Sequence, residues 1–218
     1  MKRTVTSFFD KEYLEYAKYV VENRAIPSCI DGLKPTQRKV VYIANKIWKT
    51  GNEKPMKLFQ LAGRVAAEAF YHHGNTSLES SMVGMAQKFK NSLPLLEGIG
   101  QFGSLRSPSA GAPRYISAKL HPNFRLLYQD FELLDNKIEE GERIEPEHFL
   151  PIVPTVILNG TSGIAVGFAT NILNRNPKDV VDACIAEVHG KRMKTLAPWI
   201  EEFKGTFTRD LGFLFNML

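Results

Sequence analysis

Apolar residues recur at intervals of three and four positions over most of the first half of the chain. This spacing places them on one face of a helix, so we predict helices over residues 9–20, 34–51 and 57–70, and after a tight turn at 71–75. The positions expected to face the core in the last three helices are Val40, Ile43, Ala44, Ile47, Leu58, Leu61, Ala62, Val65, Ala69, Leu78, Met82, Met85 and Phe89. Two helices joined by a short glycine-containing turn predict a helix-turn-helix.

The pattern changes near Leu93. PLLEGIGQFGS is punctuated by glycine, and RYISAKL alternates like a strand, which would place Tyr115, Ser117 and Lys119 on one face. Helices followed by a short sheet predict an α+β fold that contains a winged helix-turn-helix. A last helix is expected over 178–188, with four apolar residues buried: Val181, Cys184, Ile185 and Val188.

Composition and charge narrow the class of protein. The chain is 44% hydrophobic and 23% charged, as globular proteins are, and neither a membrane-spanning run nor a signal peptide is expected. Cys29 and Cys184 fit no metal or redox spacing, which favours a reduced, intracellular protein. A net charge of +5 mildly favours polyanionic partners.

Two generic motifs lack the context they need. Residues 98–103 match the dinucleotide pattern G-x-G-x-x-G, but SLRSPSAGAP follows where a helix is required. His72 and His73 are adjacent, so their side chains should diverge and are not expected to ligate one metal ion. With no cluster of carboxylates in the sequence, we predict no metal site in this chain.

The basic residues at one helix start indicate an anionic ligand. Lys34, Arg38 and Lys39 flank a helix start, where free N–H groups favour a phosphate. Together with residues 75–77, at the start of the presumed recognition helix, they predict a phosphate-binding surface. A solvated basic face explains the same residues equally well, and Arg114-Tyr115 is ambiguous in isolation.

Five motifs carry a family resemblance, in order: AIPSCIDGLKPTQRKVVY, QLAGRVAAEAFYHHGNTSLESSMVGMAQKF, PLLEGIGQFGS, APRYISAKL and LPIVPTVILNGTSGIAVGFATNI. They resemble the breakage-reunion region of type IIA DNA topoisomerases over about residues 25–205. The paired histidines and APRY look like the eukaryotic and T-even-phage enzymes, whereas NGTSGIAVGFATNI is more similar to gyrases.

The resemblance implies a domain order. Residues 1–28 would form a helical arm that contacts a partner subunit, and 29–122 a mainly helical winged-helix domain with a CAP-like helix-turn-helix, a small sheet and the catalytic tyrosine. Residues 123–205 would begin an α/β tower domain with a DNA-intercalating loop. The apolar tail 206–218 is atypical, so we expect a truncated product, a split gene or a fragment.

The resemblance also implies roles for individual residues. Tyr115 would attack a DNA phosphate and form a 5′-phosphotyrosyl bond, while Arg114 stabilises the transition state. His73, His72 and Arg38 would lie beside the scissile phosphate. The implied DNA contacts are Lys34, Lys39, Tyr71 and Ser77, with Ile164 as an apolar wedge that bends the duplex. One departure is that RSPSAGAPRY lacks the acidic residue common in this loop.

Cofactors and partners follow from the same resemblance. The family uses Mg²⁺, held by a TOPRIM domain, and ATP. Because Met1 stands only 24 residues before AIPSCIDGLKP, we expect both to be bound by a separate polypeptide. Two copies of this chain would act on double-stranded DNA within a larger hetero-oligomer, in the cytoplasm of a bacterium, with a phage-infected host favoured.

Two other classes of function remain open. The chain could be a winged-helix DNA-binding regulator without catalysis, or a degenerate topoisomerase fragment that only bends or clamps DNA. Covalent capture of DNA distinguishes both from the enzyme. A hydrolase built on Ser162 or the histidines is a more distant alternative.

Overall fold

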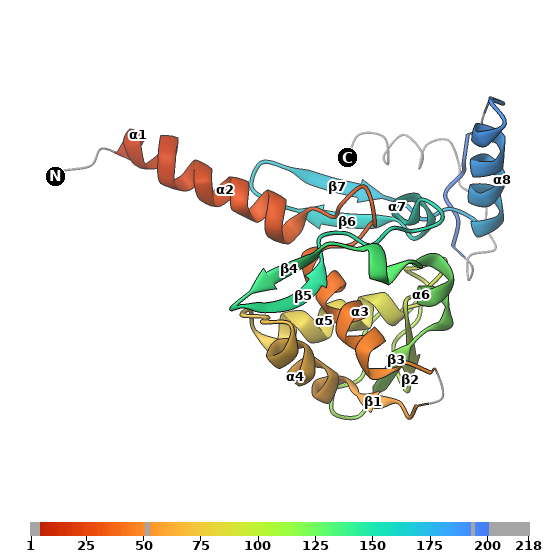
Figure 1. Cartoon of the computed structure of the whole chain (residues 1–218), viewed down its shortest axis with the longest axis horizontal. Coiled ribbons are helices and arrows are strands. Elements are labelled where there is room, and N and C mark those ends of the chain that lie inside the picture. The colour runs from red at the N-terminus through yellow and green to blue at the C-terminus, as the bar shows by residue number, and fades with distance from the viewer. Residues whose placement is uncertain (1–4, 51–52, 193–194, 201–218) are drawn as a thin grey trace.

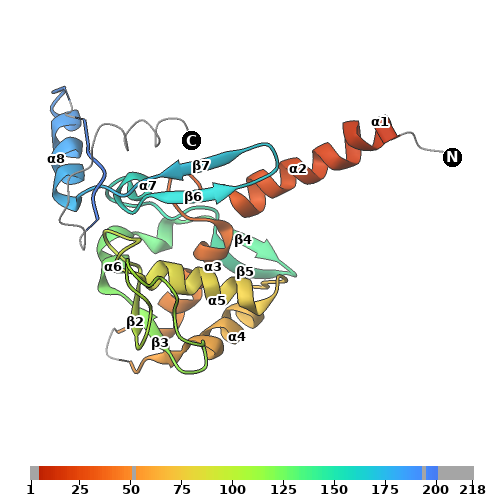
Figure 2. The ribbon, with the colours of Figure 1, turned by 180° about the vertical axis from the view of Figure 1, so that it is seen from behind.

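The computed structural model describes residues 5–50, 53–192 and 195–200. It is an α+β structure in which a helical arm projects from a body of helices and small antiparallel sheets (Figure 1). The hairpin β6–β7 and helix α8 lie on the same side of the body as the arm, and the reverse view shows the same arrangement (Figure 2).

The arm is a continuous run of helical segments, as predicted over residues 9–20. It consists of α1 Val5–Phe8, the π-helix η1 Phe9–Tyr13, α2 Leu14–Val20 and the π-helix η2 Val21–Ala25. The side chains of Phe9, Tyr13, Tyr16 and Tyr19 are all exposed. The arm therefore meets the body mainly at its end, where Ala25 is buried.

Three helices form the centre of the body: α3 Pro35–Ile47, α4 Leu58–Glu68 and α5 Asn75–Ala86. The predicted core is confirmed, because every expected inward position is buried except Ile47, which is partly buried. Full burial of a Leu or Met side chain contributes about 1.5–3 kcal/mol each. Phe89 is buried although α5 ends three residues before it.

A three-stranded antiparallel sheet packs beside these helices, with strand order β1-β3-β2. Its strands are β1 Met56–Lys57, β2 Leu96–Ile99 and β3 Ser117–Leu120. The prediction that Tyr115 shares a strand face with Ser117 and Lys119 is wrong. The backbone N–H groups of Tyr115 and Ile116 both donate to Ala112 O, at 2.9 and 3.4 Å, so a turn precedes the strand.

The remainder of the described chain consists of short elements. They are α6 Pro122–Leu127, the 3-10 helix η3 Phe131–Leu133, β4 Asn136–Glu139, β5 Glu142–Pro146, α7 Thr155–Leu158, β6 Thr161–Ile164, β7 Ala169–Ile172 and α8 Pro177–Val188. Strands β4 and β5 form one antiparallel hairpin, and β6 and β7 form another.

Helix α8 has the predicted extent but not the predicted buried face. Val180 is its buried residue and Cys184 is partly buried, whereas Val181, Ile185 and Val188 are exposed. The expectation that all four apolar residues 181, 184, 185 and 188 are buried is wrong, because the body meets the helix on the side of Val180 and Cys184.

Some predictions fall beyond these elements. The atypical tail 206–218 and the end of the segment 123–205 lie outside the described residues, and the proposed domain boundaries stay predictions. Among the helices that the structure describes, none is both long and apolar enough to cross a membrane.

Candidate functional site

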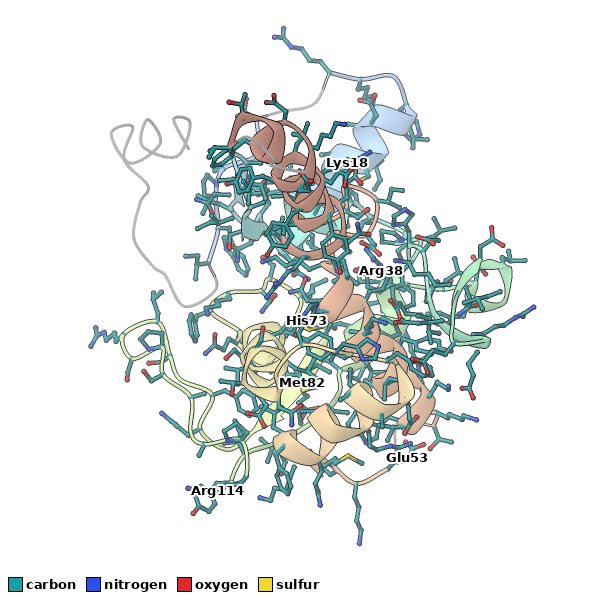
Figure 3. All side chains as sticks on the ribbon, turned by 90° about the vertical axis from the view of Figure 1, so that its left-hand side faces the viewer. Lys18, Arg38, Glu53, His73, Met82 and Arg114 are labelled. Atoms are coloured by element: carbon teal, nitrogen blue, oxygen red, sulfur yellow. The ribbon has the colours of Figure 1, made fainter. Side chains whose placement is uncertain are left out.

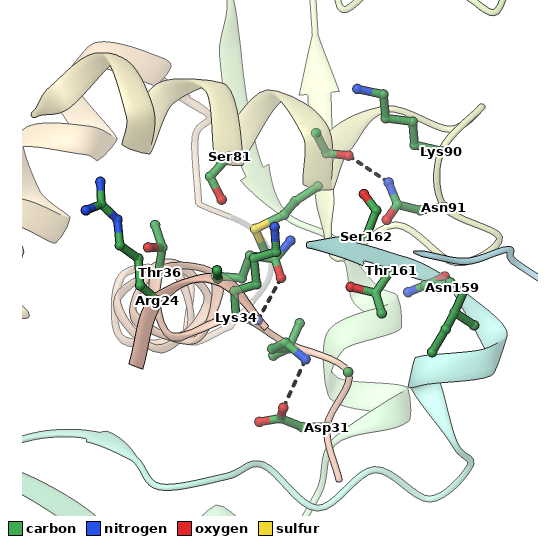
Figure 4. Close-up of a pocket in the computed structure, with 18 of the residues that line it drawn as sticks. Arg24, Asp31, Lys34, Thr36, Ser81, Lys90, Asn91, Asn159, Thr161 and Ser162 are labelled. Carbon is green, nitrogen blue, oxygen red and sulfur yellow. Dashed lines mark hydrogen bonds between the residues drawn. The ribbon is translucent and has the colours of Figure 1, made fainter. Parts of the chain in front are cut away.

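A cleft of about 870 Å³ lies where the arm, the loop before α3, helix α5 and the hairpin β6–β7 meet. Figure 4 shows Arg24 and Lys34 near α5, with Thr161 and Ser162 of β6 opposite them. Hydroxyl and amide groups line much of the remaining wall: Thr36, Ser77, Ser80, Ser81, Asn91, Asn159, Thr161, Ser162, Asn171 and Asn174. These neutral donors suit a ligand with many oxygen acceptors.

The charge of the cleft is positive. Arg24, Lys34 and Lys90 line it, and Asp31 is its one acidic lining residue within the described chain. Partial burial lowers the pKa of the Lys34 ammonium below its ordinary value, because desolvation disfavours the charged form. An anion beside Lys34 would offset that cost.

Asp31 is fully buried and connects distant parts of the fold. Its carboxylate accepts hydrogen bonds from Leu33 N at 3.0 Å and Phe149 N at 3.1 Å. Arg38 donates to both carboxylate oxygens, from Nε at 2.7 Å and from Nη2 at 3.0 Å, and Nη2 also donates to Leu33 O at 3.1 Å. This network fixes the loop that carries Lys34 into the cleft.

Arg38 lies away from the cleft, and its role beside a DNA phosphate stays a prediction. It is 3% exposed, its charge is balanced by Asp31, and it does not line the cleft. The sequence pattern identifies a cation at a helix start, but it does not reveal that the carboxylate seven residues earlier is buried and pairs with it.

Lys39 is also engaged within the protein rather than directed at the cleft. Its ammonium donates to Ala69 O at 2.5 Å and lies 3.2 Å from Glu145 Oε2 and 3.3 Å from Glu139 Oε2. Glu145 is buried, so this ion pair anchors the β4–β5 hairpin to α3 and α4. The predicted basic surface at the start of α3 is thereby reduced to Lys34.

The two histidines diverge, as their adjacency predicts. His73 lines the cleft, where the buried ring of Tyr71 packs edge-on against it with ring centroids 5.4 Å apart. His72 instead lies on the side of the β4–β5 hairpin, with Nε2 3.5 Å from Glu139 Oε1. Tyr71 therefore positions His73, and Ser77 follows in the first turn of α5 on the same wall.

The β6–β7 hairpin brings an apolar side chain to the cleft. Ile164 is 86% exposed and lines the cleft on the same strand as Ser162, and Ile164 pairs with Ala169 across the hairpin. Gly163, between Ser162 and Ile164 on β6, lies against the backbone of Ala25, where a Cβ atom would collide with the Ala25 carbonyl oxygen. The hairpin is thus seated on the end of the arm with Ile164 pointing outward.

Arg114 and Tyr115 lie outside this cleft. Tyr115 is 70% exposed, and the Arg114 guanidinium carbon lies 5.1 Å from the centre of its ring. Figure 3 shows Arg114 well separated from His73 in the body. One chain therefore presents a cationic cleft and an exposed Arg-Tyr pair as two separate surfaces.

The structure adds residues that the sequence motifs do not single out. Arg24 is exposed at the end of the arm, and Lys90 follows α5; both line the cleft. The position of Arg24 directly before the AIPSCIDGLKP motif is the signal that could have found it. Asn159, the C-cap residue of α7, exchanges two hydrogen bonds with the backbone of Leu93, at 2.8 and 2.9 Å.

The described residues offer no complete metal site. Across that part of the chain, no three His, Cys, Asp or Glu side chains gather as a metal ion would require. Both cysteines are free thiols. The residues present therefore do not fit a complete Mg²⁺ site.

Comparisons with known proteins show the family of this chain. The family model for the A-type subunit of DNA gyrase/topoisomerase IV matches residues 24–213. The medium subunit of the phage T4 DNA topoisomerase is 42% identical over 203 residues, which cover 93% of this chain and 46% of that protein. DNA topoisomerase 2 of Arabidopsis thaliana is 41% identical over 214 residues, covering 95% of this chain and 14% of its own length.

A solved structure gives the same result. The DNA-binding, cleavage and re-ligation domain of Plasmodium falciparum topoisomerase II superposes with a TM-score of 0.81 at 36% identity, over 92% of this chain and 28% of that one. This chain thus spans less than half the length of each of these relatives. It belongs to the family of the A-type subunits of DNA gyrase and topoisomerase IV, and corresponds to the breakage-reunion region of type IIA topoisomerases, which use Mg²⁺ and ATP.

Proposed function

We propose that this chain is the DNA-cleaving part of an ATP-dependent type II DNA topoisomerase, with Tyr115 as its nucleophile. The observation that carries the proposal is the exposed Tyr115 side chain, held beside Arg114 on a hydrogen-bonded turn. At 70% exposure the Tyr115 phenol is accessible to a large substrate, as attack on a DNA phosphate requires.

The reaction is a transesterification. Tyr115 Oη forms a bond to phosphorus while the bond from phosphorus to the 3′ oxygen breaks. The phenol loses its proton, and the released 3′ oxygen gains one. The phosphodiester energy is kept in the tyrosyl ester, so the reverse step reseals the strand. Arg114 supplies a fixed positive charge for the developing phosphoryl charge.

The cationic cleft would hold the DNA backbone. Arg24 and Lys34 line the cleft and would contact phosphates, while His73 and Ser77 would add hydrogen-bonding groups. Contacts of this kind position a duplex without reading its sequence. Helices α4 and α5 with the β1-β3-β2 sheet would act as a winged helix, α5 being the helix that faces the DNA, and the segments after it would begin a tower domain.

Ile164 would act as the wedge. An exposed isoleucine at the end of β6, lining a cationic cleft, can insert between base pairs and lower the cost of a kink. Bending would let the duplex follow both the cleft and the hairpin.

Two copies of the chain would be required. Because Tyr115 does not line the cleft of its own chain, we propose that it reacts with a phosphate held in the cleft of a second copy. Each copy would then cut one strand of the gate duplex. His72 and Arg38 would act indirectly, His72 through its pairing with Glu139 and Arg38 by fixing the loop that carries Lys34.

Mg²⁺ and ATP would come with a partner. Because the described residues do not fit a Mg²⁺ site, we propose that a TOPRIM- and ATPase-bearing subunit holds both. The arm at 1–28 would contact that subunit through its exposed aromatic side chains. The relatives come from a phage and from eukaryotes, and we propose action on DNA in a phage-infected bacterium.

A mixed-variant experiment tests the composite site. Tyr115→Phe lacks the nucleophile and Arg24→Ala weakens the cleft, so each variant alone should give little covalent DNA adduct with Mg²⁺ and the partner subunit. Equal mixtures should recover adduct, because some pairs combine an intact Tyr115 of one copy with an intact cleft of the other. Mixtures that stay as inactive as either variant would contradict the shared site.

The alternative is a DNA-binding and bending protein without catalysis. The separation of Tyr115 from the cleft within one chain is the observation that favours it. It predicts DNA bending that is identical in the wild type and Tyr115→Phe, with no covalent adduct from either protein.

A further inference from the structure

The turn that carries Tyr115 is attached to the first residues of α4. Leu58 N donates to Ile116 O at 3.1 Å, and Phe59 N donates to Pro113 O at 3.4 Å. Between these two contacts, Lys57 Nζ donates to the carbonyl oxygen of Tyr115 itself at 2.8 Å. The backbone on both sides of the tyrosine is thereby held to one helix end.

We propose that Lys57 is a positioning residue for Tyr115: its ammonium fixes the tyrosine carbonyl and so sets the direction in which the phenol is presented. The inference rests on the proposed function of Tyr115 as the nucleophile. Of the three bonds from α4 and its preceding residue, this one is the shortest and the one made by a side chain.

Strand pairing fixes the backbone of Lys57, from which its side chain makes that contact. Lys57 is the last residue of β1, and it pairs with Ser117 of β3, two positions after the tyrosine. The residue is partly buried, and its ammonium makes no ion pair with a carboxylate among the described residues. The ammonium is therefore directed at the Tyr115 backbone and not at an acidic neighbour.

Such a contact matters because the Tyr115 side chain has little packing support. At 70% exposure, its ring is held by the Arg114 guanidinium and by the backbone that bears it. A shift of the backbone at Tyr115 would displace the phenol from an in-line approach to phosphorus. Misplacement of a reacting group by about 1 Å can reduce a rate by about 100-fold.

The contact is less important for stability. The Leu58 and Phe59 backbone bonds and the β1–β3 pairing remain when the Lys57 side chain is changed. Loss of Lys57 should therefore leave folding and DNA binding largely intact while slowing the covalent step.

The experiment uses Lys57→Met, Lys57→Arg and the control Lys54→Met, which removes the same charge from an exposed lysine three residues away. Each chain, with the partner subunit, Mg²⁺ and saturating DNA, is followed for single-turnover adduct formation. We expect about a 10- to 100-fold slower step in Lys57→Met, recovery to within about threefold in Lys57→Arg, and no change in Lys54→Met. DNA affinity should stay within about twofold of the wild type in all three.

A second readout does not depend on cleavage. A fluorotyrosine at position 115 reports the surroundings of the ring by ¹⁹F NMR in the protein without DNA. Its resonance should shift or broaden in Lys57→Met and be unchanged in Lys54→Met. A wild-type cleavage rate or an unchanged resonance in Lys57→Met would overturn the positioning role. Failure of the wild type itself to attach to DNA would instead overturn the function proposed for Tyr115.

Discussion

Replacing Arg38 by methionine leaves the buried Asp31 carboxylate without its cation. The exposed fractions of Asp31 and Arg38 are 0% and 3%, so water does not replace the lost partner. The Leu33 carbonyl also loses a donor. Methionine keeps most of the side-chain volume, which isolates the loss of charge and hydrogen bonds from the opening of a cavity.

The expected magnitude follows from burial. Removing one partner of a buried ion pair costs about 3–5 kcal/mol in the free energy of unfolding. At roughly 2–4 °C per kcal/mol for a chain of this size, the melting temperature should fall by roughly 6–20 °C. Leu33 N and Phe149 N still donate to Asp31, so folding at low temperature should survive.

The assay compares Arg38→Met with Lys34→Met by urea unfolding and by DNA binding at several salt concentrations. Lys34 lines the cleft, and burial lowers the pKa of its ammonium, so Lys34→Met should keep the stability and reduce the salt slope of binding by about 1. Arg38→Met should lower the stability and, below its melting temperature, keep the salt slope of DNA binding. An Arg38→Met protein of wild-type stability with weakened DNA binding would refute the reasoning.

Three further predictions concern other parts of the fold. His121 Nδ1 accepts a hydrogen bond from Asn123 N at the start of α6. Burial is the main reason that the pKa of His121 is lowered from its ordinary value of 6.5. The stability that the neutral ring provides is therefore present above pH 6.5 and is lost as the pH falls below that value. His121→Asn keeps a cap but should flatten that loss in urea unfolding at about pH 7.5 and about pH 5.5; an equally steep loss would contradict the assignment. Ile164→Ser should reduce DNA bending measured by energy transfer while leaving melting unchanged, since the residue is 86% exposed; unchanged bending would exclude the wedge. Gly160→Ala should lower stability more than Gly141→Ala. Both glycines have a positive φ, but of the two only Gly160 would bring a Cβ atom into collision with backbone, at the Ile172 carbonyl oxygen. Equal losses of stability would show that φ strain alone matters.

The central helices were predictable because their sequence is regular. The positions from Val40 to Met85 that repeat at helical spacing are the ones that pack together in the core. Local periodicity is sufficient when a helix is surrounded on its apolar face. Periodicity was not sufficient for α8, because the body covers only part of the apolar face of that helix and the sequence does not show which part.

The candidate site was less predictable because its chemistry depends on distant partners. Arg38 and Lys39 look alike in sequence to Lys34, yet Asp31 and Glu145 pair with their charges and leave Lys34 in the cleft. The alternation of RYISAKL continues through Tyr115, but hydrogen bonds to Ala112 make a turn there. The spacing of polar and apolar residues does not report either kind of contact.

The most direct test of the account is covalent capture of DNA by Tyr115. Wild type and Tyr115→Phe are incubated with Mg²⁺, 5′-end-mapped DNA and the TOPRIM-bearing subunit, then stopped with denaturant. The account predicts that wild type alone remains attached to 5′ ends, although both proteins bind the duplex equally. Attachment by Tyr115→Phe, or by neither protein, would contradict the assignment of Tyr115 as the nucleophile of this chain.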